Sequence, residues 1–87
     1  MKRYGIRWTA KGREFRDSVY DARYVSDVFG KGFYLVIYSY GNRQRRYEVE
    51  CHRNGDALYY VGTFWLFNKA CKKAVEWATL KRLQGEI

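Results

Sequence analysis

The sequence has no proline, only two cysteines and only one histidine, and each scarcity excludes a class of structure. Without proline, and with no Ser/Gly tract in its place, the chain shows no linker, so we expect one domain over residues 1–87. Cys51 and Cys71 are too few for a disulfide scaffold. Each lies on the apolar side of its predicted element, which predicts buried free thiols.

Residues suited to metal or catalytic chemistry are equally scarce. Cys51, His52 and Cys71 lack the fourth ligand and the paired spacing of a zinc site. The sequence has no glycine-rich phosphate loop and no serine-centred triad motif. We therefore expect no metal, no cofactor and no enzymatic activity. A small ribonuclease is one low-ranked possibility for function. Such enzymes use a base, an acid and a phosphate-binding cation, and one predicted strand face carries residues of these types: Arg46, Glu48, Glu50 and His52.

Long apolar runs are also missing. No stretch approaches the roughly 20 apolar residues of a membrane span, and residues 1–7 lack the apolar core of a signal peptide. We expect a cytoplasmic protein that does not enter a membrane.

Basic residues, in contrast, are abundant and unevenly distributed. The net charge is +8 and the pI is about 9.7, above the value of about 9 that is typical of nucleic-acid-binding domains. Residues 1–16 carry a net +5, residues 17–30 a net −2, residues 31–56 a net +2 and residues 57–87 a net +3. Such clustering favours a nucleic-acid partner over an acidic protein surface.

Hydrophobic periodicity predicts an α+β domain. Residues 33–63 predict a three-stranded antiparallel meander. Its first and third segments are rich in aromatic and β-branched residues, residues 45–53 alternate apolar with polar side chains, and Gly41-Asn42 and Asn54-Gly55-Asp56 supply the turns. An alanine-rich stripe predicts a helix over 66–84, packed on one face of the sheet.

The first third of the chain has a weaker pattern. Residues 1–16 are expected to form a basic arm or a strand. Residues 17–30 are expected to form a short helix, because Ser18 and Asp21 match a capping box and Gly30 is placed to end it.

Three groups of residues carry a family resemblance over about fifty residues. Gly62-Thr63-Phe64 is followed by an alanine stripe at 70, 74 and 78, and Tyr47-Glu48-Val49 precedes both. This resembles the three-strand-plus-helix DNA-binding domain of ethylene-response factors and the N-terminal, arm-binding domains of tyrosine integrases. The resemblance implies that an exposed sheet face contacts duplex DNA, through the residues at its matching positions: Tyr34, Tyr38, Tyr40, Arg43, Arg45, Arg46 and Arg53. It also implies an accessory or regulatory role in a phage or mobile element.

Two carboxylates modify this expectation. Glu48 and Glu50 project from the same predicted face as Arg46 and would repel phosphate. The hairpin tip and the N-terminal arm are therefore the expected contacts.

A second resemblance concerns RNA. Helix, three strands and helix is also the order of elements in double-stranded-RNA-binding domains, whose last helix begins with a lysine cluster. The chain has Lys69, Lys72 and Lys73 at similar positions. We rank this interpretation below duplex DNA.

The predicted function is therefore that of a small basic nucleic-acid-binding protein. Arginine forks match phosphate oxygens and guanine edges, so the hairpin arginines form the central group. The predicted contacts are Arg43, Arg45, Arg46, Arg53, Lys2, Arg3, Arg7, Lys11, Tyr38, Tyr40, Lys69, Lys72 and Lys73. The alternative is a phage-type inhibitor of a host protein, because exposed Tyr, Trp and Arg side chains also anchor protein interfaces.

Overall fold

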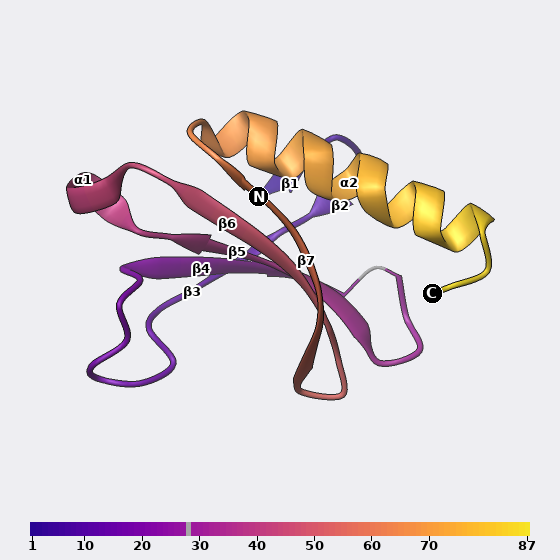
Figure 1. The fold of residues 1–87 in the computed structure, drawn as a ribbon, viewed down its shortest axis with the longest axis horizontal. Helices are drawn as coiled ribbons and strands as arrows, with labels where there is room; N and C mark the ends of the chain where they lie inside the picture. Colours follow the sequence, from indigo (N-terminus) through magenta and orange to yellow (C-terminus); the bar gives the residue numbers. More distant parts are fainter. Residues whose placement is uncertain (28) are drawn as a thin grey trace.

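The computed structural model describes residues 1–27 and 29–87, with Asn42 and Arg43 described by their backbone alone. Within this part of the chain, seven strands form two sheets, and a long helix follows them (Figure 1). The elements are β1 (Lys2–Arg3), β2 (Ile6–Arg7), β3 (Thr9–Lys11), β4 (Ala22–Ser26), β5 (Phe33–Ser39), α1 (Gly41–Gln44), β6 (Tyr47–Arg53), β7 (Asp56–Phe64) and α2 (Phe67–Leu83).

The larger sheet is a simple meander. Its strand order is β3-β4-β5-β6-β7, and every neighbouring pair is antiparallel. The smaller sheet is the hairpin of β1 and β2. The expected α+β class, with an antiparallel sheet and a C-terminal helix, is confirmed. The expected number of strands is wrong, because β3 and β4 extend the three-stranded meander to five strands.

The short helix expected over 17–30 is also wrong. Residues Ala22–Ser26 form β4, which lies between β3 and β5. Tyr24 and Val25 favour strands, and the edge of β5 offers this segment a full ladder of hydrogen bonds that a helix of two or three turns would not outweigh. Gly30, expected to end the helix, instead lies at a φ of 65° in the turn between β4 and β5.

The N-terminal residues are fixed strands rather than a free arm. Trp8, which follows β2, is only 1 % exposed and belongs to the central core. The backbone N–H of Trp8 donates a hydrogen bond of 2.7 Å to the carbonyl of Met1 and closes the β1–β2 hairpin. The basic side chains of this segment are therefore displayed from a docked hairpin.

The core lies between α2 and one face of the larger sheet. Small helix residues let the helix approach the sheet closely, and the helix matches the expected 66–84 to within one residue at each end. The buried residues that meet here are Phe33, Leu35, Ile37, Val49, Cys51, Ala70, Cys71, Ala74 and Ala78. Hairpin β1–β2 and α2 together cover this face (Figure 1).

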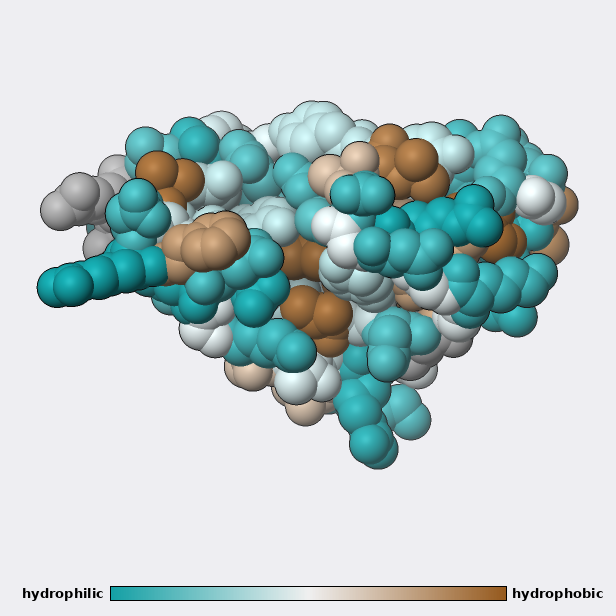
Figure 2. Space-filling view, turned by 90° about the horizontal axis from the view of Figure 1, so that it is seen from below, coloured by the Kyte–Doolittle hydropathy of each residue, from teal (hydrophilic) through white to brown (hydrophobic). Residues whose placement is uncertain are grey.

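The opposite face of the sheet has a mixed surface. Seen from that side, polar residues surround small and separate apolar patches (Figure 2). The connection between β3 and β4 bends toward the tip of the β5–β6 hairpin, where the backbone N–H of Asp21 donates a hydrogen bond of 2.8 Å to the carbonyl of Ser39. The expected turn at this tip contains the single helical turn α1, which ends at Arg45 in the left-handed conformation, with a φ of 46°.

Candidate nucleic-acid interface

The β1–β2 hairpin is attached to the start of α2 by one side-chain amide. Asn68 Oδ1 accepts a hydrogen bond of 3.1 Å from Arg3 Nη1, and Asn68 Nδ2 donates one of 2.8 Å to Tyr4 Oη. The guanidinium of Arg3 also lies 5.4 Å from the ring centre of Phe67, a cation–π distance. Tyr4 and Gly5 both have positive φ, which produces the tight turn that aims the hairpin at the helix.

The outer face of α2 begins with three exposed lysines. Because Ala70, Cys71 and Ala74 face the sheet, Lys69 and Lys72 point away from it, and Lys73 lies at the edge of the same face. Lys73 Nζ lies 3.3 Å from Glu76 Oε2. The first turn of α2 contains no acidic residue.

Hairpin and helix together hold nearly all of the net charge of the chain. Residues 1–7 and 67–83 contain eight of the 17 Lys and Arg residues but only one of the nine Asp and Glu residues, a net +7. The remaining residues have nine bases and eight acids, a net +1. We call the cations of the hairpin and of the start of α2 the basic face, because the contact of Arg3 with Asn68 holds the two elements side by side. Its members are Lys2, Arg3, Arg7, Lys69, Lys72 and Lys73.

The basic face contains three unfavourable electrostatic arrangements. Lys2 and Arg7 are cross-strand partners, and like charges opposite one another destabilise a strand pair. Lys69 lies one helical turn before both Lys72 and Lys73, which adds repulsion of a few tenths of a kcal/mol for each pair. Lysines near a helix N-terminus also oppose the helix dipole, which favours anions there.

The arginines at the β5–β6 tip, expected as the central group of contacts, are not all free to bind a ligand. Arg46 is engaged: its Nε lies 3.2 Å from Glu48 Oε1, in an ion pair too bent for a good hydrogen bond, and its guanidinium lies 4.3 Å from the ring centre of Tyr40. Arg45 is exposed. The side chain of Arg43 lies outside the described residues.

The tyrosines and carboxylates of the open sheet face bind one another. Tyr40 donates a hydrogen bond of 3.0 Å to Glu48, and the rings of Tyr38 and Tyr20 lie 4.7 Å apart, so the β3–β4 connection covers Tyr38. Burial raises the pKa of the Tyr38 hydroxyl, and the negative charge of Glu50 raises it further. Burial also raises the pKa of Tyr40, assisted by the hydrogen bond to Glu48.

His52 belongs to the same network. Its Nε2 lies 2.9 Å from Glu50 Oε1 and 3.5 Å from Tyr38 Oη, and its ring lies 5.2 Å from that of Tyr34. The histidine side chain is only 12 % exposed. In this arrangement the polar groups of the sheet face contact one another, so little of their surface is free to contact a phosphate.

The remaining predicted contacts are dispersed. Lys11 projects from the edge strand β3, and Arg53 lies over the ring of Phe33 at 5.0 Å, at the far end of β6. Neither is brought to the basic face by a contact within the described residues.

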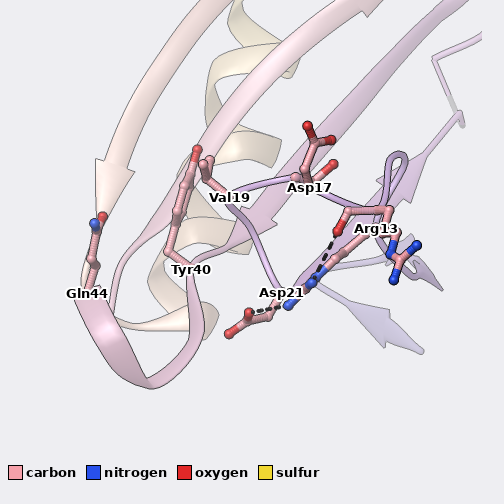
Figure 3. Close-up of a pocket in the computed structure, with 8 residues that line it drawn as sticks. Arg13, Asp17, Val19, Asp21, Tyr40 and Gln44 are labelled. Atoms are coloured by element: carbon pink, nitrogen blue, oxygen red, sulfur yellow. Dashed lines mark hydrogen bonds and ion pairs between the residues drawn. The ribbon is translucent and has the colours of Figure 1, made fainter.

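A cavity of about 510 Å³ lies beside the hairpin tip (Figure 3). Its lining combines both charges: Arg13, Arg16, Asp17, Ser18, Val19, Asp21, Tyr40 and Gln44. Arg13 is already engaged, because its Nη2 lies 3.3 Å from Asp21 Oδ1 and its Nη1 donates to the carbonyl of Arg16. The cavity therefore has little net charge and differs in character from the basic face.

The described residues contain no group of three His, Cys, Asp or Glu side chains that would hold a metal ion. Among residues 1–27 and 29–87, no helix is both long and apolar enough to cross a membrane.

Tyr4, Trp65 and Asn68 were not among the contacts that the sequence predicted. Asn68 attaches the hairpin to the helix, Tyr4 receives that contact, and Trp65 is exposed in the connection between β7 and α2. The available signal for Asn68 was a polar, poor helix-forming residue in the first turn of the predicted helix.

Comparison with protein-family models, with curated proteins and with solved structures finds no match to this chain. The resemblance to ethylene-response factors and integrase arm-binding domains therefore stays a prediction.

Proposed function

We propose that this chain is a nucleic-acid-binding protein that holds the phosphate backbone of duplex DNA on its basic face. The observation that carries the proposal is the concentration of cations on hairpin β1–β2 and at the start of α2. There Lys2 lies opposite Arg7, and Lys69 repels Lys72 and Lys73 at the helix end that favours anions. Folding alone would favour an acidic residue in the first helical turn. A polyanion would relieve all three repulsions at once and release its counterions.

We prefer duplex DNA to RNA because the families that the sequence resembles bind duplex DNA. The test below includes an RNA probe to decide between the two. An accessory or regulatory role in a phage or mobile element is the biological setting that the resemblance suggests. We place the main contact on the helix side rather than at the β5–β6 tip, because Arg46 is paired with Glu48. Among the described residues the basic face has one ion pair, between Lys73 and Glu76, and five further cations.

The test compares three variants with equal loss of charge. The first is Lys69→Gln/Lys72→Gln on the basic face, the second is Arg43→Gln/Arg45→Gln at the tip, and the matched control is Lys11→Gln/Lys31→Gln. Fluorescence anisotropy with a random-sequence duplex, and with a double-stranded RNA of equal length, is measured at about 50 and about 200 mM NaCl.

The wild type should bind DNA and weaken steeply with salt. The basic-face variant should lose most affinity, with the log–log salt slope reduced by about one unit per lysine. Equal losses in all three variants would mean that binding follows net charge alone. A larger loss in the tip variant would make the β5–β6 tip the main contact. Tighter binding of RNA than of DNA would make double-stranded RNA the ligand.

A host-protein inhibitor is the second candidate, and one observation favours it. The β3–β4 connection exposes Phe15 and Val19 beside the mixed-charge cavity, on the nearly neutral part of the molecule. Such residues are suited to a protein contact that tolerates salt. This function predicts capture of one specific protein at high salt, abolished by Phe15→Asp/Val19→Asp and unaffected by the basic-face variant.

A further inference from the structure

Trp65 is the one tryptophan of the three that projects into solvent. It lies with Leu66 in the connection between β7 and α2, where the two side chains are 69 % and 66 % exposed. Trp8 is buried and Trp77 packs against Tyr59 at 5.3 Å. The neighbours of the pair, Phe64 and Phe67, both pack on the core, so they hold the connection in place while Trp65 and Leu66 face outward.

This exposed pair adjoins the basic face. Leu66 lines a shallow groove of about 400 Å³, together with Tyr4, Asn68, Lys69, Lys72 and Lys73. The connection turns at the N-terminal end of α2, on the helix side of the sheet (Figure 1). Trp65 lies two residues before α2 begins and four residues before Lys69, the first lysine of that helix.

We propose that Trp65 stacks on an unpaired nucleobase while Lys69 and Lys72 hold the adjoining phosphates. The flat indole ring can stack on any nucleobase, because every base has an aromatic face. Stacking of this kind is therefore independent of sequence. In an intact duplex the base faces are covered by their neighbours, so the favoured ligand has a bulged or single-stranded nucleotide beside the gripped backbone.

Lipid headgroups are the competing occupant, because lysines beside a tryptophan also suit a membrane surface. The surroundings favour a nucleobase. Leu66 lines a groove that contains an amide and a phenol, from Asn68 and Tyr4. The first turns of α2 do not continue an apolar surface from Trp65 and Leu66, because the exposed residues over 67–76 are Asn68, Lys69, Lys72, Lys73 and Glu76.

The inference rests on the proposed function, and the experiment separates the two. Wild type, Trp65→Ala and Trp65→Phe are compared, and Phe15→Ala is the matched control because Phe15 is 66 % exposed on the β3–β4 connection. The probes are an intact duplex, the same duplex with one bulged nucleotide, a thymidine single strand, and vesicles of mixed phosphatidylglycerol and phosphatidylcholine. All variants are first checked for an unchanged melting temperature, which is expected for surface substitutions.

Trp65→Ala should weaken binding of the bulged and single-stranded probes about tenfold, and intact duplex by less than about twofold. Trp65→Phe should keep most of the affinity because it keeps an aromatic ring, and the ligand-induced quenching of tryptophan emission should vanish in it. Phe15→Ala should match the wild type.

Other results would overturn the inference. If Trp65→Ala binds every nucleic acid as the wild type does, Trp65 does not stack, and the proposed function stands without it. An equal loss on intact and bulged duplex would remove the preference for unpaired bases. Binding of vesicles but of no nucleic acid would replace both proposals with a membrane surface.

Discussion

The two cysteines show how the surroundings of a single residue decide its chemistry. Cys51 in β6 and Cys71 in α2 are 1 % and 0 % exposed, and they belong to the same core cluster. Burial disfavours the charged thiolate and raises the pKa of both thiols, that of Cys71 to about 11. Both act as small apolar side chains, as the sequence predicted.

This gives a prediction for thiol reactivity. The native protein should react very slowly with a disulfide reagent near pH 8, because access is blocked and little thiolate forms, and both thiols should react at once in denaturant. Absorbance of the released chromophore measures this. Rapid reaction of either thiol in the native state would contradict the burial described here.

The same pKa shift affects stability. An unfolded thiol ionises near its ordinary pKa of 9.0 while the folded Cys71 resists until about 11, so the free energy of unfolding should fall as the pH rises through that window. Tyr38 and Tyr40, whose pKa values are also raised, should contribute in the same direction above about pH 10.

Between elements, the contact of the β3–β4 connection with the β5–β6 tip depends on one glycine. Gly41 has a φ of 62°, and a Cβ at this position would overlap the Asp21 carboxylate. Asp21 also pairs with Arg13. The absence of a side chain at Gly41 thus allows the connection to dock and Tyr20 to cover Tyr38.

Gly41→Ala should therefore destabilise the protein more than its matched control, Gly55→Ala. Gly55 also has positive φ, at 92°, but a Cβ there meets no atom within 4 Å. We expect about 1 kcal/mol for the control, from backbone strain alone, and about 2–3 kcal/mol for Gly41→Ala. Urea unfolding measures both. Equal losses would show that Asp21 moves aside at no cost.

For the molecule as a whole, the main feature is the separation of charge between two sides. The hairpin and α2 carry a net +7 on one side of the sheet, whereas the acidic residues are concentrated in the sheet and its connections. The tertiary structure brings Arg3 and Tyr4 to Asn68 across more than 60 residues of sequence. It thereby joins two basic segments into one surface.

This separation predicts a salt-dependent stability. Because like charges repel across the basic face, the melting temperature should rise as NaCl is added up to about 0.2 M, where screening shortens the range of repulsion to under about 10 Å. Lys69→Gln/Lys72→Gln should melt higher than the wild type at low salt and respond less to NaCl. Calorimetry or circular dichroism measures this.

Lys11→Gln/Lys31→Gln is the control for that experiment, since it removes the same charge elsewhere. If both variants gained equal stability at low salt, the repulsion would belong to the net charge rather than to the basic face. A wild type that is less stable in salt would mean that the ion pairs of the sheet outweigh this repulsion.

Local pattern was sufficient for the last two thirds of the fold. Strand β6 alternates with period two, β5 and β7 are rich in aromatic and β-branched residues, and α2 repeats its small residues at helical spacing. Residue type and local spacing therefore predict each of these elements. The candidate site was predicted only in part. Lys2, Arg3, Arg7, Lys69, Lys72 and Lys73 were named from charge, but their common surface was not foreseen.

By itself, the sequence determined the α+β class, the helix, the buried thiols and the excess of positive charge, because each follows from residue type and local spacing. Only the tertiary structure decided that Ala22–Ser26 is a strand, that Arg46 is paired with Glu48, and that hairpin and helix share one basic face. The physical reason is the same in each case. These outcomes depend on residues that are distant in sequence and meet only when the chain folds, so a local sequence pattern does not predict them.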